Sequence, residues 1–281
     1  MPSVSIIVIS LDGSRGGNVP KLLQDIERQT VKEKELFVVT HTSPNGKARN
    51  EGIRKAKGEF LIFLDDDVRL GHERIFQNLL KGFEEKQNVG MTGGSIRLPQ
   101  DANAFMKRVG EELPRWQIPV VEKAKESDLV TTACCAIPRK VLDDVGLFHE
   151  GLRRGVDPEL RARLRKRGYP ILLLPDTFFF HPLPKNLKEL IEYSYSRGAG
   201  AAYGQRYFPN LRYEVPAFGK ELQKEKRPFL YRLFRNLSVL GLALLTFKWL
   251  RLTDELSYGV GFVSFYLKST LSGASHGEKA S

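Results

Sequence analysis

The sequence predicts an α/β protein with a mostly parallel sheet flanked by helices, followed by a helical C-terminal extension. In residues 1–97, short apolar runs alternate with segments whose apolar residues recur at helical spacing, the pattern of parallel strands joined by helices. Beyond Asn186 the pattern is helical and includes two longer apolar runs. The 281 residues are 41% hydrophobic and 27% charged, the composition of a globular protein rather than a disordered one.

Strand and helix signals alternate through the first hundred residues. Continuous apolar runs are typical of buried parallel strands, and they cover Val4–Ser10, Glu35–Thr40, Glu59–Leu64 and Val89–Arg97. Helical spacing predicts helices over Pro20–Gln29, Lys47–Lys57 and Glu73–Glu85. Proline suits the first helical turn and glycine the position after a helix, so we expect Pro20 to begin the first helix and Gly58 to close the second.

The same alternation continues after a less regular stretch. Residues 101–128 show no clear period and are predicted to be loop with a short helix. Further strands are predicted at Leu129–Ile137 and Tyr169–Leu174. Further helices are predicted at Arg139–Val145, stopped by Gly146, at Asp157–Arg167, stopped by Gly168, and from beyond Asn186 to about Tyr207.

The cysteines and the start of the chain narrow the class of protein. The two cysteines, Cys134 and Cys135, are adjacent, which excludes a disulfide framework and a zinc site built on several cysteines. The first residues lack the basic region and the small-residue cleavage site of a signal peptide, so we interpret them as leading into the first strand. We therefore expect a protein of the reducing cytoplasm.

The charge is unevenly distributed. Residues 1–150 carry equal numbers of basic and acidic side chains, so the whole net charge of +11 falls in residues 151–281. A basic half indicates an anionic partner, namely phosphates, nucleic acid or an acidic membrane surface, or else a solvated basic surface. The sequence contains no RRM, KH, zinc-finger or basic-zipper pattern, so a nucleic-acid-binding protein is the less favoured alternative.

Three aspartates follow the third predicted strand. Asp65, Asp66 and Asp67 come directly after the apolar run Phe60–Leu64, at the end of the strand where open parallel sheets bind ligands. Adjacent carboxylates repel one another unless a cation neutralises them. Mg²⁺ and Mn²⁺ bind one or two carboxylates together with phosphate oxygens. The sequence therefore indicates a divalent cation site, the alternative being a solvated acidic turn before the next helix.

Two later residues could also carry chemistry. Asp157 precedes Pro158 at a predicted helix start, where it would act as a helix N-cap, as a general base, or as both. His181 follows an aromatic strand and precedes Pro182. A lone histidine is commonly structural, and His181 would matter for chemistry only if the fold brings it to Asp67.

These segments, taken together, resemble a family 2 glycosyltransferase with the GT-A fold. After a first strand at Val4–Ser10, the family's ARNxG helix corresponds to Ala48–Ile53. The family's strand ending in the DxD motif corresponds to Gly58–Asp67. The resemblance covers about residues 3–200 in the family's order, and its later parts are Ala136–Arg139, Val145–Glu150, Asp157–Leu164 and Leu174–His181. Each motif is weak alone, but four of them in sequence are specific.

The resemblance implies an inverting transfer from a nucleotide-sugar donor to an acceptor hydroxyl, without a protein nucleophile. It implies that Asp157 is the base and that Asp67 and His181 hold Mn²⁺ or Mg²⁺. It further implies donor contacts from Ser10, Arg49, Asp65 and Asp66. The expected division is a GT-A catalytic domain at 1–200, with a nucleotide-sugar-binding half at 1–97 and an acceptor half at 98–200, and a helical basic extension at 201–281.

The chain departs from the family pattern at two places. The second strand ends at Val39–Thr42 without the acid that commonly contacts the nucleotide base, and Val156 replaces the first of two acids before the base helix. A nucleotidyltransferase, which would release pyrophosphate, and an inactive scaffold are the remaining alternatives. Acceptor contacts are expected from residues 98–128, where Trp116 could stack on a sugar or a lipid head.

The C-terminal extension carries a pattern of its own. Its apolar runs, Leu237–Phe247 and Tyr258–Leu267, are shorter than the roughly 20 residues that span a bilayer. Basic and aromatic residues surround the first run, so Arg227–Leu267 is predicted to lie on an anionic membrane surface. The acceptor would then be lipid-linked or a cell-surface glycan precursor, and the enzyme would be peripheral on the inner face of the cell membrane. Buried helices or a homodimer contact are the alternatives.

Overall fold

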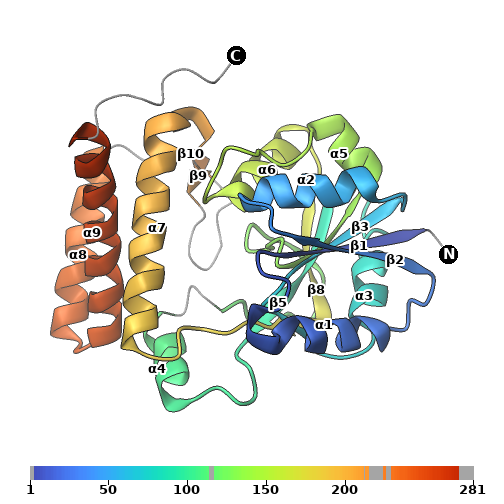
Figure 1. Cartoon of the computed structure of the whole chain (residues 1–281), viewed down its shortest axis with the longest axis horizontal. Coiled ribbons are helices and arrows are strands. Elements are labelled where there is room, and N and C mark those ends of the chain that lie inside the picture. The colour runs from blue at the N-terminus through green and yellow to red at the C-terminus, as the bar shows by residue number, and fades with distance from the viewer. Residues whose placement is uncertain (1–2, 114–116, 212, 215–223, 226–228, 272–281) are drawn as a thin grey trace.

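The computed structural model describes residues 3–113, 117–211, 213–214, 224–225 and 229–271. Its core is a twisted eight-stranded sheet in the order β2-β1-β3-β7-β5-β8-β4, with β6 also paired to β8 (Figure 1). Sheet strands are β1 (Val4–Ser10), β2 (Lys34–Thr40), β3 (Phe60–Asp65), β4 (Arg69–Leu70), β5 (Met91–Arg97), β6 (Lys125–Glu126), β7 (Cys134–Pro138) and β8 (Ile171–Phe180).

The sheet is mostly parallel, as predicted. Strands β2, β1, β3, β5 and β8 share one direction, while β7 runs antiparallel between β3 and β5. The short strands β4 and β6 pair antiparallel with β8. The insertion of β7 brings its first residues to the edge where the parallel strands end, because Cys134 pairs with Leu64.

Helices cover both faces of the sheet. In Figure 1, α2 (Asn45–Lys55), α5 (Arg139–Val145) and α6 (Val156–Lys166) lie above it, and α1 (Asn18–Glu27) and α3 (Ile75–Lys81) lie below it. Successive residues of a strand point to opposite faces. Ile7 therefore belongs to the core on the α2 side, while Ile6 and Val8 belong to the core on the α1 side.

Several predicted boundaries were wrong. Gly58 does not close α2, which ends at Lys55; Gly58 instead lies so close to β1 that a Cβ there would be 2.6 Å from the Ser5 nitrogen. The strand predicted at Leu129–Ile137 is a loop up to residue 133, followed by β7. Strand β8 continues six residues past Leu174, because the aromatic run pairs with β5 and β4.

The short helix η1 (Arg15–Gly17) leads from β1 into α1. The other elements lie beside the sheet. They are α4 (Ala104–Glu112), α7 (Leu187–Tyr207), α8 (Phe229–Leu245), α9 (Trp249–Leu271), the short helix η3 (Pro209–Leu211), and the hairpin of β9 (Tyr213–Glu214) and β10 (Lys224–Glu225). Helix α7 starts where predicted, since the Asn186 side chain accepts a hydrogen bond from the Glu189 nitrogen at 3.0 Å. It crosses residue 200 without a break, and the division into domains stays a prediction.

Helix α9 packs along α7 with almost no space between the backbones. A Cβ at Gly198 would lie 1.9 Å from the Tyr258 carbonyl oxygen, and one at Gly261 would lie 2.1 Å from the Tyr195 carbonyl oxygen. The fully buried Asp254 carboxylate of α9 accepts hydrogen bonds from Ser194 and from Arg197 of α7, the latter at 2.8 Å. In the described part of the chain, no helix is long and apolar enough to cross a membrane.

This contact gives a test of the helical layer. We expect Gly198→Ala to destabilise the protein, because the new methyl group must push the α9 backbone away. Gly204→Ala, on the same helix, meets nothing within 4 Å and should stabilise by up to about 1 kcal/mol through helix propensity. Urea unfolding of both variants measures the two effects. Equal stabilisation by both would show that α7 and α9 do not lie this close.

Candidate active site

The three aspartates lie at the carboxyl end of β3, beside the end of β1. Ile9 pairs with Asp65, so the next residue of β1, Ser10, faces the aspartates. The Ser10 hydroxyl donates a hydrogen bond of 2.7 Å to Asp66 Oδ2 and accepts one of 3.1 Å from the Gly13 nitrogen. Burial raises the pKa of Asp66, and the bond from Ser10 opposes that rise. The loop after β1 is thereby attached to the aspartate cluster.

Arg49 of α2 forms an ion pair with Asp65, the first of the three aspartates. Its guanidinium Nη2 lies 2.7 Å from Asp65 Oδ1, and the side chain is buried. The guanidinium also lies 5.5 Å from the centre of the Phe148 ring. Burial raises the pKa of Asp65; Arg49 opposes this rise, while the nearby Asp67 and Asp157 add to it. The three aspartates and Asp157 therefore bring more negative charge together than Arg49 alone balances.

Asp67 presents a carboxylate oxygen to which no described group donates a hydrogen bond. Its Oδ2 accepts a bond of 3.2 Å from Arg15, whereas Oδ1 is buried and has no hydrogen-bond partner among the described residues. His181 Nε2 lies 3.4 Å from that oxygen. The other ring nitrogen, Nδ1, is 2.9 Å from the Pro182 carbonyl oxygen and can only donate to it. In a neutral imidazole, Nε2 then carries no proton and faces a carboxylate oxygen that accepts no hydrogen bond from a described residue. A cation between the two atoms would stabilise this arrangement.

The two atoms fit a divalent cation that takes its other ligands from a substrate. Carboxylate oxygen and imidazole nitrogen are both ligands of Mn²⁺-type ions. In the described ranges, no group of three or more His, Cys, Asp and Glu side chains converges to hold a metal. A cation here would have two protein ligands and would need several more from solvent or phosphate oxygens.

Asp157 is held by a residue that the sequence did not suggest. Its carboxylate accepts a bond of 2.5 Å from the Thr132 hydroxyl and a longer one of 3.4 Å from the Thr132 nitrogen. Thr132 belongs to the loop before β7, and the Asp65 nitrogen donates to its neighbour Ala133 at 3.1 Å. The loop thus places Asp157 beside the aspartate cluster. The only signal available in the sequence was a pair of threonines before an apolar run.

The alternative reading of Asp157 as a helix N-cap was wrong. Gly155 occupies the cap position in a left-handed conformation, with φ of 85°, and Asp157 lies inside the first turn of α6. One turn further along, the buried guanidinium of Arg161 donates to the Val130 carbonyl oxygen. Burial lowers the pKa of Arg161, and the attraction of Asp157 and Asp128 opposes this. Asp157 therefore does not cap α6, and the buried guanidinium of Arg161 lies one turn further along the helix.

An acid does lie at the end of the second strand, although it comes from α2. Thr42, just beyond β2, donates a bond of 2.8 Å to Glu51 Oε2. The Lys55 ammonium lies 2.7 Å from the other carboxylate oxygen, and its hydrogen bond is the largest cause of the lowered pKa of Glu51. Glu51 is thus an ionised carboxylate beside the end of β2, a position where the strand sequence itself showed none.

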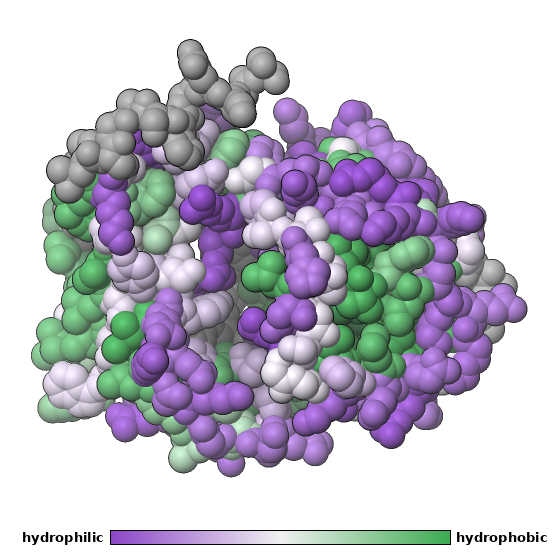
Figure 2. Space-filling model, in the orientation of Figure 1, coloured by the Kyte–Doolittle hydropathy of each residue, from purple (hydrophilic) through white to green (hydrophobic). Residues whose placement is uncertain are grey.

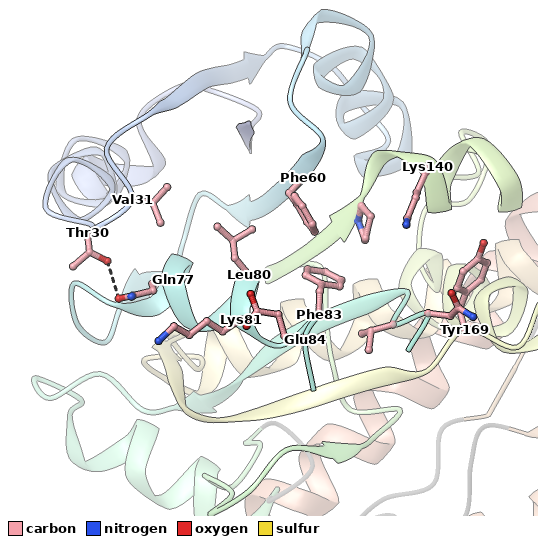
Figure 3. A pocket seen from close by; sticks show the side chains of 13 residues that line it. Thr30, Val31, Phe60, Gln77, Leu80, Lys81, Phe83, Glu84, Lys140 and Tyr169 are labelled. Atoms are coloured by element: carbon pink, nitrogen blue, oxygen red, sulfur yellow. Dashed lines mark hydrogen bonds between the residues drawn. The ribbon is translucent and has the colours of Figure 1, made fainter. Parts of the chain in front are cut away.

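A separate cavity lies at the other edge of the sheet. It has a volume of about 690 Å³ and is formed where β3 and β5 begin, with Phe60, Leu80 and Phe83 on its wall and Lys140 at its rim (Figure 3). The predicted site residues lie at the opposite ends of these strands, and none of them lines this cavity. Trp116, the predicted acceptor contact, lies outside the described residues.

Comparisons with known proteins identify the family and the fold. The family described as "Glycosyltransferase like family 2" matches residues 1–195. No curated protein matches the chain in a sequence search. Among solved structures, the mannosyltransferase PcManGT from Pyrobaculum calidifontis, in complex with GDP-Man and Mn²⁺, has a TM-score of 0.57 at 15% identity, over 93% of this chain and 87% of that one. GalNAc-T7 with UDP, GalNAc and Mn²⁺ has a TM-score of 0.51 at 14% identity, over 74% and 52%. At these identities, the likenesses show the GT-A fold.

The Arg49–Asp65 pair gives a test of the site that needs no substrate. Arg49→Met leaves a buried carboxylate without its counter-ion, so we expect a loss of about 3 kcal/mol in unfolding free energy at pH 7. The loss should shrink towards pH 5, because the unpaired Asp65 has a further raised pKa and becomes neutral. Urea unfolding at both pH values measures this. Arg49→Met/Asp65→Asn should recover part of the loss, and a double variant no better than the single one would contradict the pairing.

Proposed function

The chain belongs to glycosyltransferase family 2, and from this premise we propose that it transfers a sugar, with inversion, from a nucleotide-sugar donor to an acceptor hydroxyl with the help of Mn²⁺ or Mg²⁺. The observation that carries the proposal is the unsatisfied Asp67 Oδ1 beside His181 Nε2. A buried carboxylate oxygen without a partner is costly unless something binds it. A diphosphate-bound cation meets that requirement.

Asp67 and His181 would hold the cation, and the donor diphosphate would complete its coordination. When bound, the ion supplies a positive charge that stabilises the departing diphosphate. Ser10 and Asp66 would hold the loop after β1 against the donor site, and the Arg49 guanidinium would stay paired with Asp65 next to it. The two similar structures contain Mn²⁺ and nucleotides, which supports the same use here.

Asp157 would act as the base on the acceptor side. The Thr132 hydroxyl occupies Oδ1 at 2.5 Å, while Oδ2 has only the longer contact of 3.4 Å from the Thr132 nitrogen. Oδ2 is therefore the oxygen that can accept a proton from an acceptor hydroxyl. A base on the acceptor side and a charge-stabilising site on the donor side suit a single displacement, which inverts the anomeric carbon.

Glu51 and Thr42 would contact the nucleotide base. They occupy the end of β2, the position where the family commonly has an acid, and the lowered pKa of Glu51 keeps it able to accept hydrogen bonds. The acceptor would be lipid-linked or a glycan precursor. A nucleotidyltransferase would use similar carboxylates, and release of pyrophosphate instead of a nucleoside diphosphate would identify it.

Metal dependence can be measured without knowing the sugar. At 100 times the dissociation constant, a ligand stabilises a protein by about 2.7 kcal/mol, so GDP or UDP with Mn²⁺ should raise the melting temperature by several degrees. We expect excess EDTA or Asp67→Ala to remove most of that shift. Asp144→Ala, which removes a surface acid paired with Arg167, is the matched control and should keep it. An unchanged shift in EDTA would argue against a cation at Asp67.

The role of Asp157 is tested by transfer from nucleotide sugars. Asp157→Asn still accepts the hydrogen bond from Thr132 but cannot take a proton, so transfer should fall by about 10²–10⁴-fold. Donor binding with Mn²⁺ and the melting temperature should change little. Thr132→Ser, which keeps the hydroxyl, should retain most activity. An Asp157→Asn enzyme with near-normal turnover would place the base elsewhere.

A further inference from the structure

The outer face of the α8–α9 hairpin is apolar and uncovered. In helix α9, Leu256, Val260, Val263 and Leu267 recur at helical spacing and are all exposed. Helix α8 and the turn add Phe234, Leu237, Leu242, Leu244, Leu245, Phe247 and Trp249. Leu245 is 79% exposed, Phe247 72% and Phe234 66%. Figure 2 shows this surface as hydrophobic side chains along the left side of the molecule, over α8 and α9. We call it the outer face.

The orientation of the outer face is set by contacts on the other side of α9. Beyond the buried Asp254, Tyr195 of α7 shares a hydrogen bond of 2.8 Å with Ser264, and Arg206 donates one of 2.7 Å to Ser269. These pairs advance together along both helices, so α7 and α9 run in the same direction. Helix α9 can therefore not rotate its apolar stripe inward without breaking a row of polar contacts.

The first turn of α9 is hydrogen-bonded to the end of α4. Glu112 at the end of α4 is buried, and its Oε2 accepts hydrogen bonds from the Leu250 and Arg251 nitrogens at 2.8 and 3.2 Å. Arg108 pairs with the same carboxylate at 2.9 Å. A carboxylate on the first nitrogens of a helix satisfies groups that the helix leaves unpaired. The exposed turn, with Phe247 and Trp249, is thus held next to α4.

The charge of the hairpin complements an anionic surface. Residues 229–271 contain five basic and two acidic residues, and one of those acids, Asp254, is buried against Arg197. Lys248 lies between Phe247 and Trp249 in the turn. The start of α7 lies beside this turn (Figure 1). Lys185, just before the helix, and Lys188, in its first turn, are exposed on either side of the exposed Leu187. Aromatic, aliphatic and basic side chains therefore share one end of the helical layer.

We propose that the outer face binds an anionic membrane surface, with α8 and α9 in the plane of the lipid headgroups. Apolar faces of this kind enter the boundary between headgroups and acyl chains, and nearby lysines and arginines add attraction to anionic lipid. A second copy of the chain is the poorer occupant, because the hairpin carries a net positive charge and two copies of it would repel each other. The proposal stands independently of the transfer reaction. If the outer face binds the membrane, Glu112 and α7 would keep the expected acceptor half close to the lipid. A cytoplasmic enzyme bound in this way would be peripheral on the inner face of the cell membrane.

The test is flotation of the full chain with lipid vesicles. We expect binding to vesicles containing phosphatidylglycerol at least tenfold stronger than to phosphatidylcholine alone, reduced but not abolished at high salt. Phe247→Ser/Trp249→Ser should lower binding at least tenfold. Leu36→Ser/Val38→Ser removes two exposed apolar residues of β2 and is the matched control, with binding unchanged. In a Trp116→Phe variant, Trp249 is the only tryptophan, and its fluorescence should shift to shorter wavelength on anionic vesicles.

Three outcomes would overturn the proposal. The first is a wild-type protein that floats with neither vesicle. The second is a Phe247→Ser/Trp249→Ser variant that floats as well as the wild type. The third is a lipid-free dimer, seen by light scattering, that the same substitutions dissociate, since the outer face would then be a contact between copies. Binding of GDP or UDP with Mn²⁺ in each variant is measured separately, so a failure of the glycosyltransferase proposal is distinguishable from a failure of this one.

Discussion

The structure depends on how four carboxylates are kept close together at one end of a sheet. Asp65, Asp66, Asp67 and Asp157 come from two segments about ninety residues apart. Burial raises the pKa of Asp65, and the charges of Asp67 and Asp157 add to that rise. Each of three has its own partner: Arg49 for Asp65, Ser10 for Asp66 and Thr132 for Asp157. Asp67 pairs with Arg15 through Oδ2, but its buried Oδ1 has no hydrogen-bond partner among the described residues. The fold thus concentrates negative charge around the oxygen at which we propose that a cation binds.

The sequence predicted those features that depend on local pattern. Apolar runs and helical spacing gave the order of strands and helices, and the strand end placed the aspartates at the ligand-binding edge. Thr132 and Glu51 could not be found in this way. Thr132 reaches Asp157 only because β7 is inserted antiparallel, and Glu51 reaches the end of β2 only because α2 packs across it. The preference of aspartate for helix N-caps misplaced Asp157, because Gly155 occupies the N-cap position of α6 in a left-handed conformation.

The helical layer connects the site to the outer face. Helix α7 begins at Leu187, a few residues after His181. It is held to α9 by the Arg197–Asp254 pair and by the close contacts of Gly198 and Gly261. Glu112 connects the start of α9 to α4, in the half where the acceptor is expected. A surface bound by α8 and α9 would therefore be at a fixed distance from Asp157. This arrangement suits an acceptor that is itself confined to a membrane.

The proposed cation site at Asp67 and His181 can be tested directly by pulsed electron paramagnetic resonance of Mn²⁺ bound with GDP or UDP. The account predicts two couplings on the same ion, one to ³¹P of the diphosphate and one to ¹⁴N of an imidazole, with the ¹⁴N coupling lost in His181→Gln. A ³¹P coupling that persists unchanged in Asp67→Ala, without any ¹⁴N coupling in the wild type, would show that the metal binds the nucleotide elsewhere and would contradict the account.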